Sequence, residues 1–163
     1  MADTLRVIEK AIEEHHHIRA GLKHAGDSVT DIEAMFTLHK EYARWSQSSV
    51  KELKEKQGEL LKAIGMLEQG LKRHFGFEEE SLPPLMGEVL MKTLTQEHGE
   101  IAGLLDKAKD SLREGTLEGL NQREMLLKKE EIQANIRQII ETVEEHASHE
   151  ETILRMIKKA LEA

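Results

Sequence analysis

The 163-residue sequence contains no cysteine, only two prolines and only five aromatic residues. The lack of cysteine excludes disulfide scaffolds, cysteine zinc sites, iron–sulfur clusters and thiol catalysis. A chain rich in Glu, Leu and Lys and poor in strand-forming residues disfavours an all-β or parallel-sheet protein. No apolar run approaches the roughly 18 residues of a membrane span. We therefore expect a helical protein without a membrane segment, whose polar chemistry depends on oxygen and nitrogen groups.

The charge balance is acidic, with 31 Asp and Glu against 23 Lys and Arg and a net charge of −8. This charge repels phosphate backbones, and no basic cluster interleaved with aromatic residues offsets it, so we expect no nucleic-acid partner. The charged start, with Asp3 and Arg6, lacks the apolar stretch of a signal peptide, which favours a cytoplasmic protein. At this length we expect one domain, 1–163, around one core.

Apolar residues recur at helical spacing in four long stretches, near 3–25, 50–82, 87–113 and 121–162. Gly26-Asp27-Ser28 is expected to end the first stretch, and the Pro83-Pro84 pair to form a corner after the second. Thr30-Asp31-Ile32-Glu33 has the form of a capping box and predicts a shorter segment at 30–45. In the third stretch, Leu90 and Leu94 are expected to face inward. The prediction is an all-α, up-down four-helix bundle with an additional short helical segment between the first and second bundle helices.

The two halves of the chain look like copies of one helical hairpin, at about 3–82 and 87–162. Glu14-His15-His16-His17-Ile18 resembles Glu97-His98-Gly99-Glu100-Ile101, and His74-Phe75-Gly76-Phe77-Glu78-Glu79 resembles His146-Ala147-Ser148-His149-Glu150-Glu151. Each hairpin thus supplies a Glu-His-x-x-Ile helix followed by a His-x-x-x-Glu-Glu helix.

Four histidines lie within the apolar stripes of the predicted helices, namely His15, His74, His98 and His146. Glu78 and Glu150 follow two of them by four residues and so share their inward faces. An ionised carboxylate in such a core costs several kcal/mol unless it is compensated. Four imidazoles and two carboxylates can hold two cations, with two histidines on each ion and the carboxylates between them. A bundle with hydrogen-bonded core histidines is the alternative, and it leaves Glu78 and Glu150 without buried partners.

Several neighbouring residues could replace a member of this set. His16 and His17 flank His15, although the repeat and the apolar stripe both favour His15. His149 and Glu151 lie beside Glu150, and Glu151 is the stronger alternative ligand. Glu79 and Glu151 are otherwise expected to be solvated or to lie outside the metal ligands. The remaining histidines, His24 and His39, match nothing in the other half.

These motifs resemble those of hemerythrin-like proteins, the HHE cation-binding domains, over the stretch from Glu14 to Glu150. The resemblance implies a bridged centre of two iron ions, with His15, His74, Glu78, His98, His146 and Glu150 as ligands. Oxygen-carrying hemerythrins have a further histidine where this chain has Ala102, and an Asp where it has Glu151. The symmetric set of four His and two Glu is more similar to that of proteins that repair damaged iron centres.

The leading functional hypothesis is a di-iron protein that senses, carries or scavenges a small gaseous or peroxide ligand such as O₂ or NO. The alternatives are a di-iron redox enzyme, a factor that donates iron to damaged iron–sulfur centres, and a protein for cation storage or structural metal binding. Zinc or manganese could substitute for iron, since the same ligands suit them. Nothing in the sequence indicates a protein partner.

Overall fold

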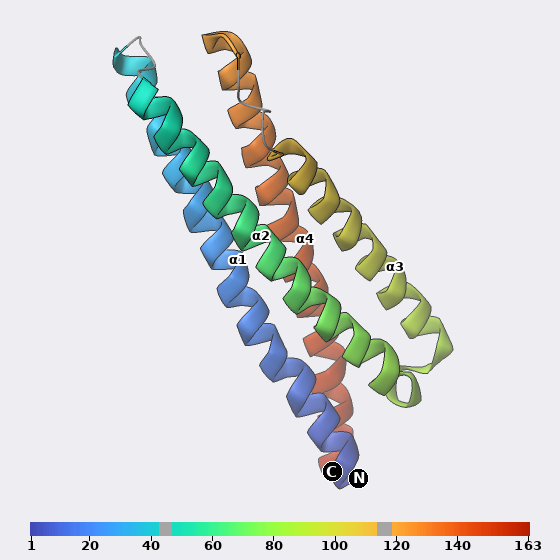
Figure 1. Cartoon of the computed structure of the whole chain (residues 1–163). Coiled ribbons are helices and arrows are strands. Elements are labelled where there is room, and N and C mark those ends of the chain that lie inside the picture. The colour runs from blue at the N-terminus through green and yellow to red at the C-terminus, as the bar shows by residue number, and fades with distance from the viewer. Residues whose placement is uncertain (43–46, 114–118) are drawn as a thin grey trace.

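The computed structural model describes residues 1–42, 47–113 and 119–163. Four helices and no strand are found in these residues: α1 (Ala2–Tyr42), α2 (Gln47–Ser81), α3 (Pro83–Ser111) and α4 (Gln122–Glu162). Successive helices run up and down, so that the two chain ends meet at one end of the bundle (Figure 1). Each helix packs against two others, with α1 between α2 and α4, and α3 between the same two. The predicted all-α four-helix bundle is confirmed.

The predicted break at Gly26-Asp27-Ser28 is wrong, because α1 continues through it as one helix of 41 residues. The helix continues because Val29 and Ile32, beyond the expected stop, are buried in the core. Such packing outweighs the helix penalty of one glycine, which is about 1 kcal/mol. Thr30 is therefore no cap residue, and its hydroxyl donates to the carbonyl of Gly26 within the helix. The expected short segment at 30–45 is largely the last part of α1, and residues 43–46 lie outside the described residues.

The predicted start of the third helix, at about Gly87, coincides with a kink in α3. The helix begins at the double proline, and Gly87 interrupts it with φ 75° and ψ 168°. The inward face of the helix after Gly87 begins at Met91, three residues before Leu94. Met91 is buried, whereas Leu90, which we expected inside, is 40% exposed.

The C-terminal end of α3 and the N-terminal end of α4, which face each other across the α3–α4 connection, have specific caps. The buried amide of Gln57 on α2 donates to the carbonyls of Leu112 and Arg113, at 2.8 and 3.2 Å. Asn121, where the sequence indicated the start of the last helix, accepts a hydrogen bond of 2.9 Å from the backbone N–H of Glu124. None of the described helices has a stretch long and apolar enough to cross a membrane.

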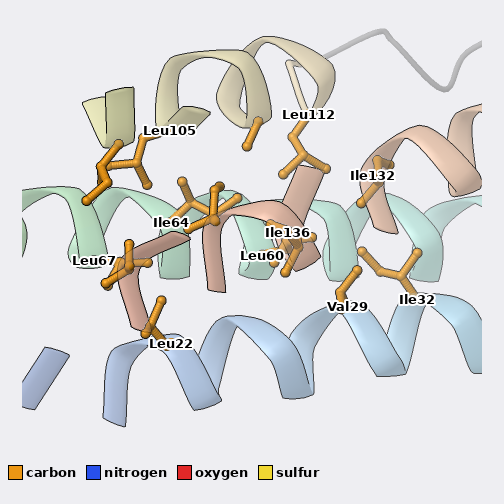
Figure 2. Close-up of a cluster of buried hydrophobic side chains, with 14 of the residues drawn as sticks. Leu22, Val29, Ile32, Leu60, Ile64, Leu67, Leu105, Leu112, Ile132 and Ile136 are labelled. Carbon is orange, nitrogen blue, oxygen red and sulfur yellow. The ribbon is translucent and has the colours of Figure 1, made fainter. Parts of the chain in front are cut away.

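The apolar core consists of two clusters of buried side chains. The larger one extends from the middle of the bundle toward the α1–α2 connection, and includes Leu22, Ile64, Leu105 and Ile136 (Figure 2). The smaller one, near the chain ends, includes Ile8, Leu82 and Leu154. The polar residues predicted to form a site lie between these two clusters along every helix.

Candidate metal centre

The six predicted site residues come together in the core of the bundle. Each helix contributes one histidine, and α2 and α4 each add one glutamate. All six side chains are at most 5% exposed, and both glutamates are fully buried. They form two overlapping groups, the first with His15 and His74 and the second with His98 and His146, and both groups share Glu78 and Glu150. Within each group the candidate ligand atoms all lie within 4.8 Å of one another.

The position of this cluster follows from the apolar spacing on either side of it. Ile18, Leu71, Ile101 and Val143, each three residues from a site histidine, belong to the larger apolar cluster. Ala11, Leu82, Leu94 and Leu154, each four residues from a site residue, belong to the smaller one. Residues three or four apart lie on one face of a helix, so the same stripe that buries the leucines also buries the site.

The outer nitrogen of each site histidine is hydrogen-bonded to a glutamate of a neighbouring helix. Nδ1 of His15 lies 2.9 Å from Glu151, Nδ1 of His74 lies 2.7 Å from Glu14, and Nδ1 of His98 lies 3.0 Å from Glu79. The fourth pair joins Nδ1 of His146 to Glu97. Because an ionised carboxylate only accepts, each Nδ1 carries the proton and each Nε2 keeps its lone pair. The four imidazoles are thereby in the tautomer that binds metal through Nε2.

These four outer glutamates connect the helices in a cycle. Glu14 of α1 serves the histidine of α2, Glu79 of α2 that of α3, Glu97 of α3 that of α4, and Glu151 of α4 that of α1. Each one is next in sequence to a site residue, and a step of one residue turns the side chain by about 100° toward the adjacent helix. Sequence reasoning did not assign this role to Glu14 or Glu97. A sign of this role was present in the sequence, because both copies of the repeat begin with a glutamate directly before the site histidine.

One of the four outer pairs has an additional cation. Arg19 donates to Glu151 at 2.7 Å and to Glu144 at 3.0 Å. Burial opposes ionisation of Glu151, but the hydrogen bonds from Arg19 and then His15 keep its pKa below the usual value. Glu151, the strongest alternative ligand considered from the sequence, thus lies on the outer side of His15.

The inner atoms of the cluster are buried polar groups without hydrogen bonds. This holds for Nε2 of all four histidines and for both oxygens of Glu78 and of Glu150. Nε2 of His15 lies 3.1 Å from a Glu150 oxygen, and Nε2 of His146 lies 3.4 Å from the other. Lone pairs at such distances repel unless a proton or a cation lies between them. Neutral imidazoles and carboxylates are also the donor set that divalent and trivalent metals prefer, so the residues present fit metal ions.

Burial sets the protonation of the cluster when no cation is bound. Desolvation, and then the adjacent Glu150 carboxylate, raise the pKa of Glu78 to about 12. Desolvation likewise lowers the pKa of His74 and of His98, against the opposing effect of their outer glutamates. At neutral pH these two imidazoles are therefore neutral, and the carboxylate pair keeps one proton.

The other histidines considered from the sequence lie elsewhere. His16, His17, His24 and His149 are exposed, and the side chain of His39 lies outside the described residues. Phe75 was not singled out from the sequence, yet its ring stacks on His98 with centroids 3.8 Å apart and an interplanar angle of 11°. The imidazoles also pack edge to face in two pairs, His15 with His74 and His98 with His146, with centroids 4.7 and 4.9 Å apart.

Comparison with known families agrees with the fold and with the composition of this cluster. The family model of the hemerythrin HHE cation-binding domain matches residues 6–157, which include all six buried polar residues. Among curated proteins no match to the chain is found.

Proposed function

Because the chain belongs to the hemerythrin HHE cation-binding domain family, we propose that its buried cluster holds two iron ions in a bridged centre that binds O₂, NO or peroxide. The observation that carries the proposal is the convergence of four Nε2 atoms and two carboxylates in a core where no group outside the cluster offers them a hydrogen bond. His15 and His74 would hold one ion and His98 and His146 the other, with Glu78 and Glu150 shared by both.

The protein residues have separate tasks in this proposal. The two shared glutamates balance cation charge, and the outer glutamates orient the imidazoles and make them better ligands. The apolar clusters on both sides, together with Phe75, keep bulk water away from the centre. Bound iron supplies redox chemistry and coordination positions beyond the six protein ligands, at which a small molecule can bind. Zinc or manganese would fit the same donors without the same chemistry, so the metal has to be measured.

Metal quantification tests the proposal directly. Protein expressed with iron available should contain two iron ions per chain, one for each group of ligands. It should show near-ultraviolet charge-transfer absorption when oxidised. His74→Ala should lose iron, whereas His149→Ala, which removes an exposed histidine near the same site, should retain it. A metal-free protein whose stability is unchanged by added iron would overturn the proposal.

A second candidate is catalysis or iron donation at the same centre, including the repair of damaged iron–sulfur proteins. The observation that favours it is the symmetry of the cluster, in which each group has two histidines and the same two glutamates. Stopped-flow mixing of the reduced protein with O₂, NO or peroxide separates the two candidates. A reversible adduct supports ligand binding, whereas multiple turnovers support an enzyme, and transfer of iron to an apo iron–sulfur protein supports repair.

A further inference from the structure

A groove of about 500 Å³ lies between α1 and α2, on the outer side of the candidate metal centre. Its walls are largely apolar and include Ile18, Met66 and Leu67. Gly21 and Gly70, one on each helix, leave the space between these walls open. A cleft of this size between bundle helices is in the range of small-molecule sites.

The corresponding positions of the second hairpin carry larger side chains than glycine. The repeat aligns His15 with His98 and His74 with His146, so Gly21 corresponds to Leu104 and Gly70 to Thr142. Both glycines lie inside helices, where each costs about 0.5–1 kcal/mol relative to alanine. A Cβ at Gly70 would meet no atom within 4 Å, and a Cβ at Gly21 would lie 3.3 Å from the end of the Leu67 side chain. Packing therefore does not require glycine at position 70, and glycine at these two positions is particular to the first hairpin.

The ionisable residues that line the groove also differ from those at the corresponding positions of the second hairpin. Arg73 and His17 line the groove, whereas Glu145 and Glu100 are the corresponding residues of the second hairpin. The guanidinium of Arg73 is exposed and has no ion-pair partner within the described parts of the chain. The one carboxylate in the lining, Glu14, already accepts the hydrogen bond from His74 at 2.7 Å. The protein as a whole carries a net charge of −8. At two positions where the second hairpin has a glutamate, the groove thus has an arginine and a histidine.

We propose that this groove binds a small organic carboxylate with an apolar body. The carboxylate would pair with Arg73 and His17, and the apolar body would cover Ile18 and Leu67 in the space that the glycines leave. A guanidinium recognises a carboxylate by paired hydrogen bonds, and the apolar walls favour a ligand that removes them from water. The groove borders the buried centre, because His74 and its partner Glu14 are part of its lining. Arg73 and His17 are not among the candidate metal ligands, so occupation of the groove does not require a metal.

Calorimetric titration of the 163-residue protein tests the proposal, both as purified and after chelator treatment. The probes are octanoate and 2-naphthoate, and 1-octanol serves as the uncharged counterpart of octanoate. Arg73→Glu gives the groove the charge of the second hairpin, and Glu145→Arg is its matched control at the corresponding position. Gly70→Leu fills the groove, and Gly103→Leu places the same side chain at an exposed helical glycine of α3.

We expect one saturable site for at least one carboxylate, with 1-octanol bound about tenfold or more weakly. Arg73→Glu should weaken carboxylate binding by a similar factor and Gly70→Leu should abolish it, while both controls stay within about twofold of the parent protein. Unfolding midpoints of the four variants show whether each is folded. The absence of binding by both carboxylates, equal binding of 1-octanol, or binding that survives Gly70→Leu would overturn the proposal. Because the chelated protein is measured as well, failure of the iron assignment leaves this test intact.

Discussion

Each site histidine is defined by what surrounds both of its ring nitrogens. The outer nitrogen donates to a glutamate, and the inner nitrogen points into a space shared with two buried carboxylates. A core histidine with a purely structural role would find hydrogen bonds on both sides, because an unsatisfied buried polar atom costs about 1–3 kcal/mol. The arrangement is repeated on all four helices, which favours metal ligation over a packing accident.

The outer glutamates provide the first prediction at this scale. Glu97→Ala removes the partner of Nδ1 of His146, so the imidazole loses both its orientation and its added basicity. We expect metal affinity to fall by about 10- to 100-fold, measured by competition with a chelator of known affinity. Glu100→Ala, an exposed glutamate on the same helix, is the control and should leave the affinity unchanged. Equal losses in both variants would show that Glu97 does not act through the histidine.

The protonated carboxylate pair provides the second prediction. The pKa of Glu78 is raised in the folded protein to about 12, above its value in an unfolded chain. Its contribution to metal-free stability is therefore full below about pH 4.5 and is lost progressively as the pH rises toward 12. Glutamine imitates the protonated form at every pH, so the stability of Glu78→Gln relative to the parent should increase with pH. We expect a gain of at least about 1 kcal/mol between pH 5.5 and 8.

Urea unfolding of the metal-free proteins at several pH values measures this difference. Glu80→Gln, an exposed position close in sequence, should show no such trend. A constant difference between Glu78→Gln and the parent would mean that Glu78 is ionised in the metal-free core.

At the scale of the helices, local sequence signals compete with packing. Gly26 does not end α1, because residues beyond it are buried in the core. Gly87, in contrast, forms a kink in α3 shortly after the double proline. The difference lies in the backbone. Gly87 has a positive φ of 75°, which side-chain-bearing residues rarely adopt, and this conformation lets Met86 and Met91 enter the core on either side of the kink.

Substitution of this glycine is therefore expected to destabilise the protein. Gly87→Ala should lower the free energy of unfolding by about 1–3 kcal/mol, because alanine is strained at this φ and ψ. Gly103→Ala is the matched control in the same helix and should raise it by about 0.5–1 kcal/mol through helix propensity. Chemical denaturation of the metal-free proteins measures both changes. Equal effects of the two substitutions would show that the kink is not needed.

At the scale of the whole molecule, the centre lies where all four helices meet, so its occupation is coupled to the folding of the bundle. Cations that bind only the folded protein stabilise it, and the binding has to displace the proton held by Glu78. The carboxylate pair thus makes metal affinity depend on pH. The neutral imidazoles of His74 and His98 contribute no such dependence near neutral pH, since burial keeps their pKa below the usual value.

Zinc, a redox-inert probe, tests this coupling. We expect the apparent affinity to rise about tenfold per pH unit for each proton released, between pH 6.5 and 7.5. Zinc should also raise the unfolding temperature of the parent but not that of His74→Ala. Competition titrations and proton-release calorimetry measure the first effect, and thermal unfolding the second. An affinity that is independent of pH would contradict a shared proton on the carboxylate pair.

The amino-acid sequence by itself determined the helical bundle and the six residues that meet in its core. Both depend on the spacing of side chains along a helix, which is a local property: a histidine in phase with leucines is buried with them, and a glutamate four residues later shares its face. The repeated motifs in the sequence added a prediction of the number of helices and of the pairing of the motifs.

Only the tertiary structure decided how far α1 extends, which carboxylate serves which imidazole, and where a groove remains open. The end of α1 depends on whether the residues past Gly26 find a core, and that core is built largely by other helices. Glu14 and Glu97 look like solvated residues in the sequence, because their partners are 60 and 49 positions away along the chain. Contacts between helices follow from how the helices are rotated and arranged around one another, and the spacing within a single helix carries no information about either.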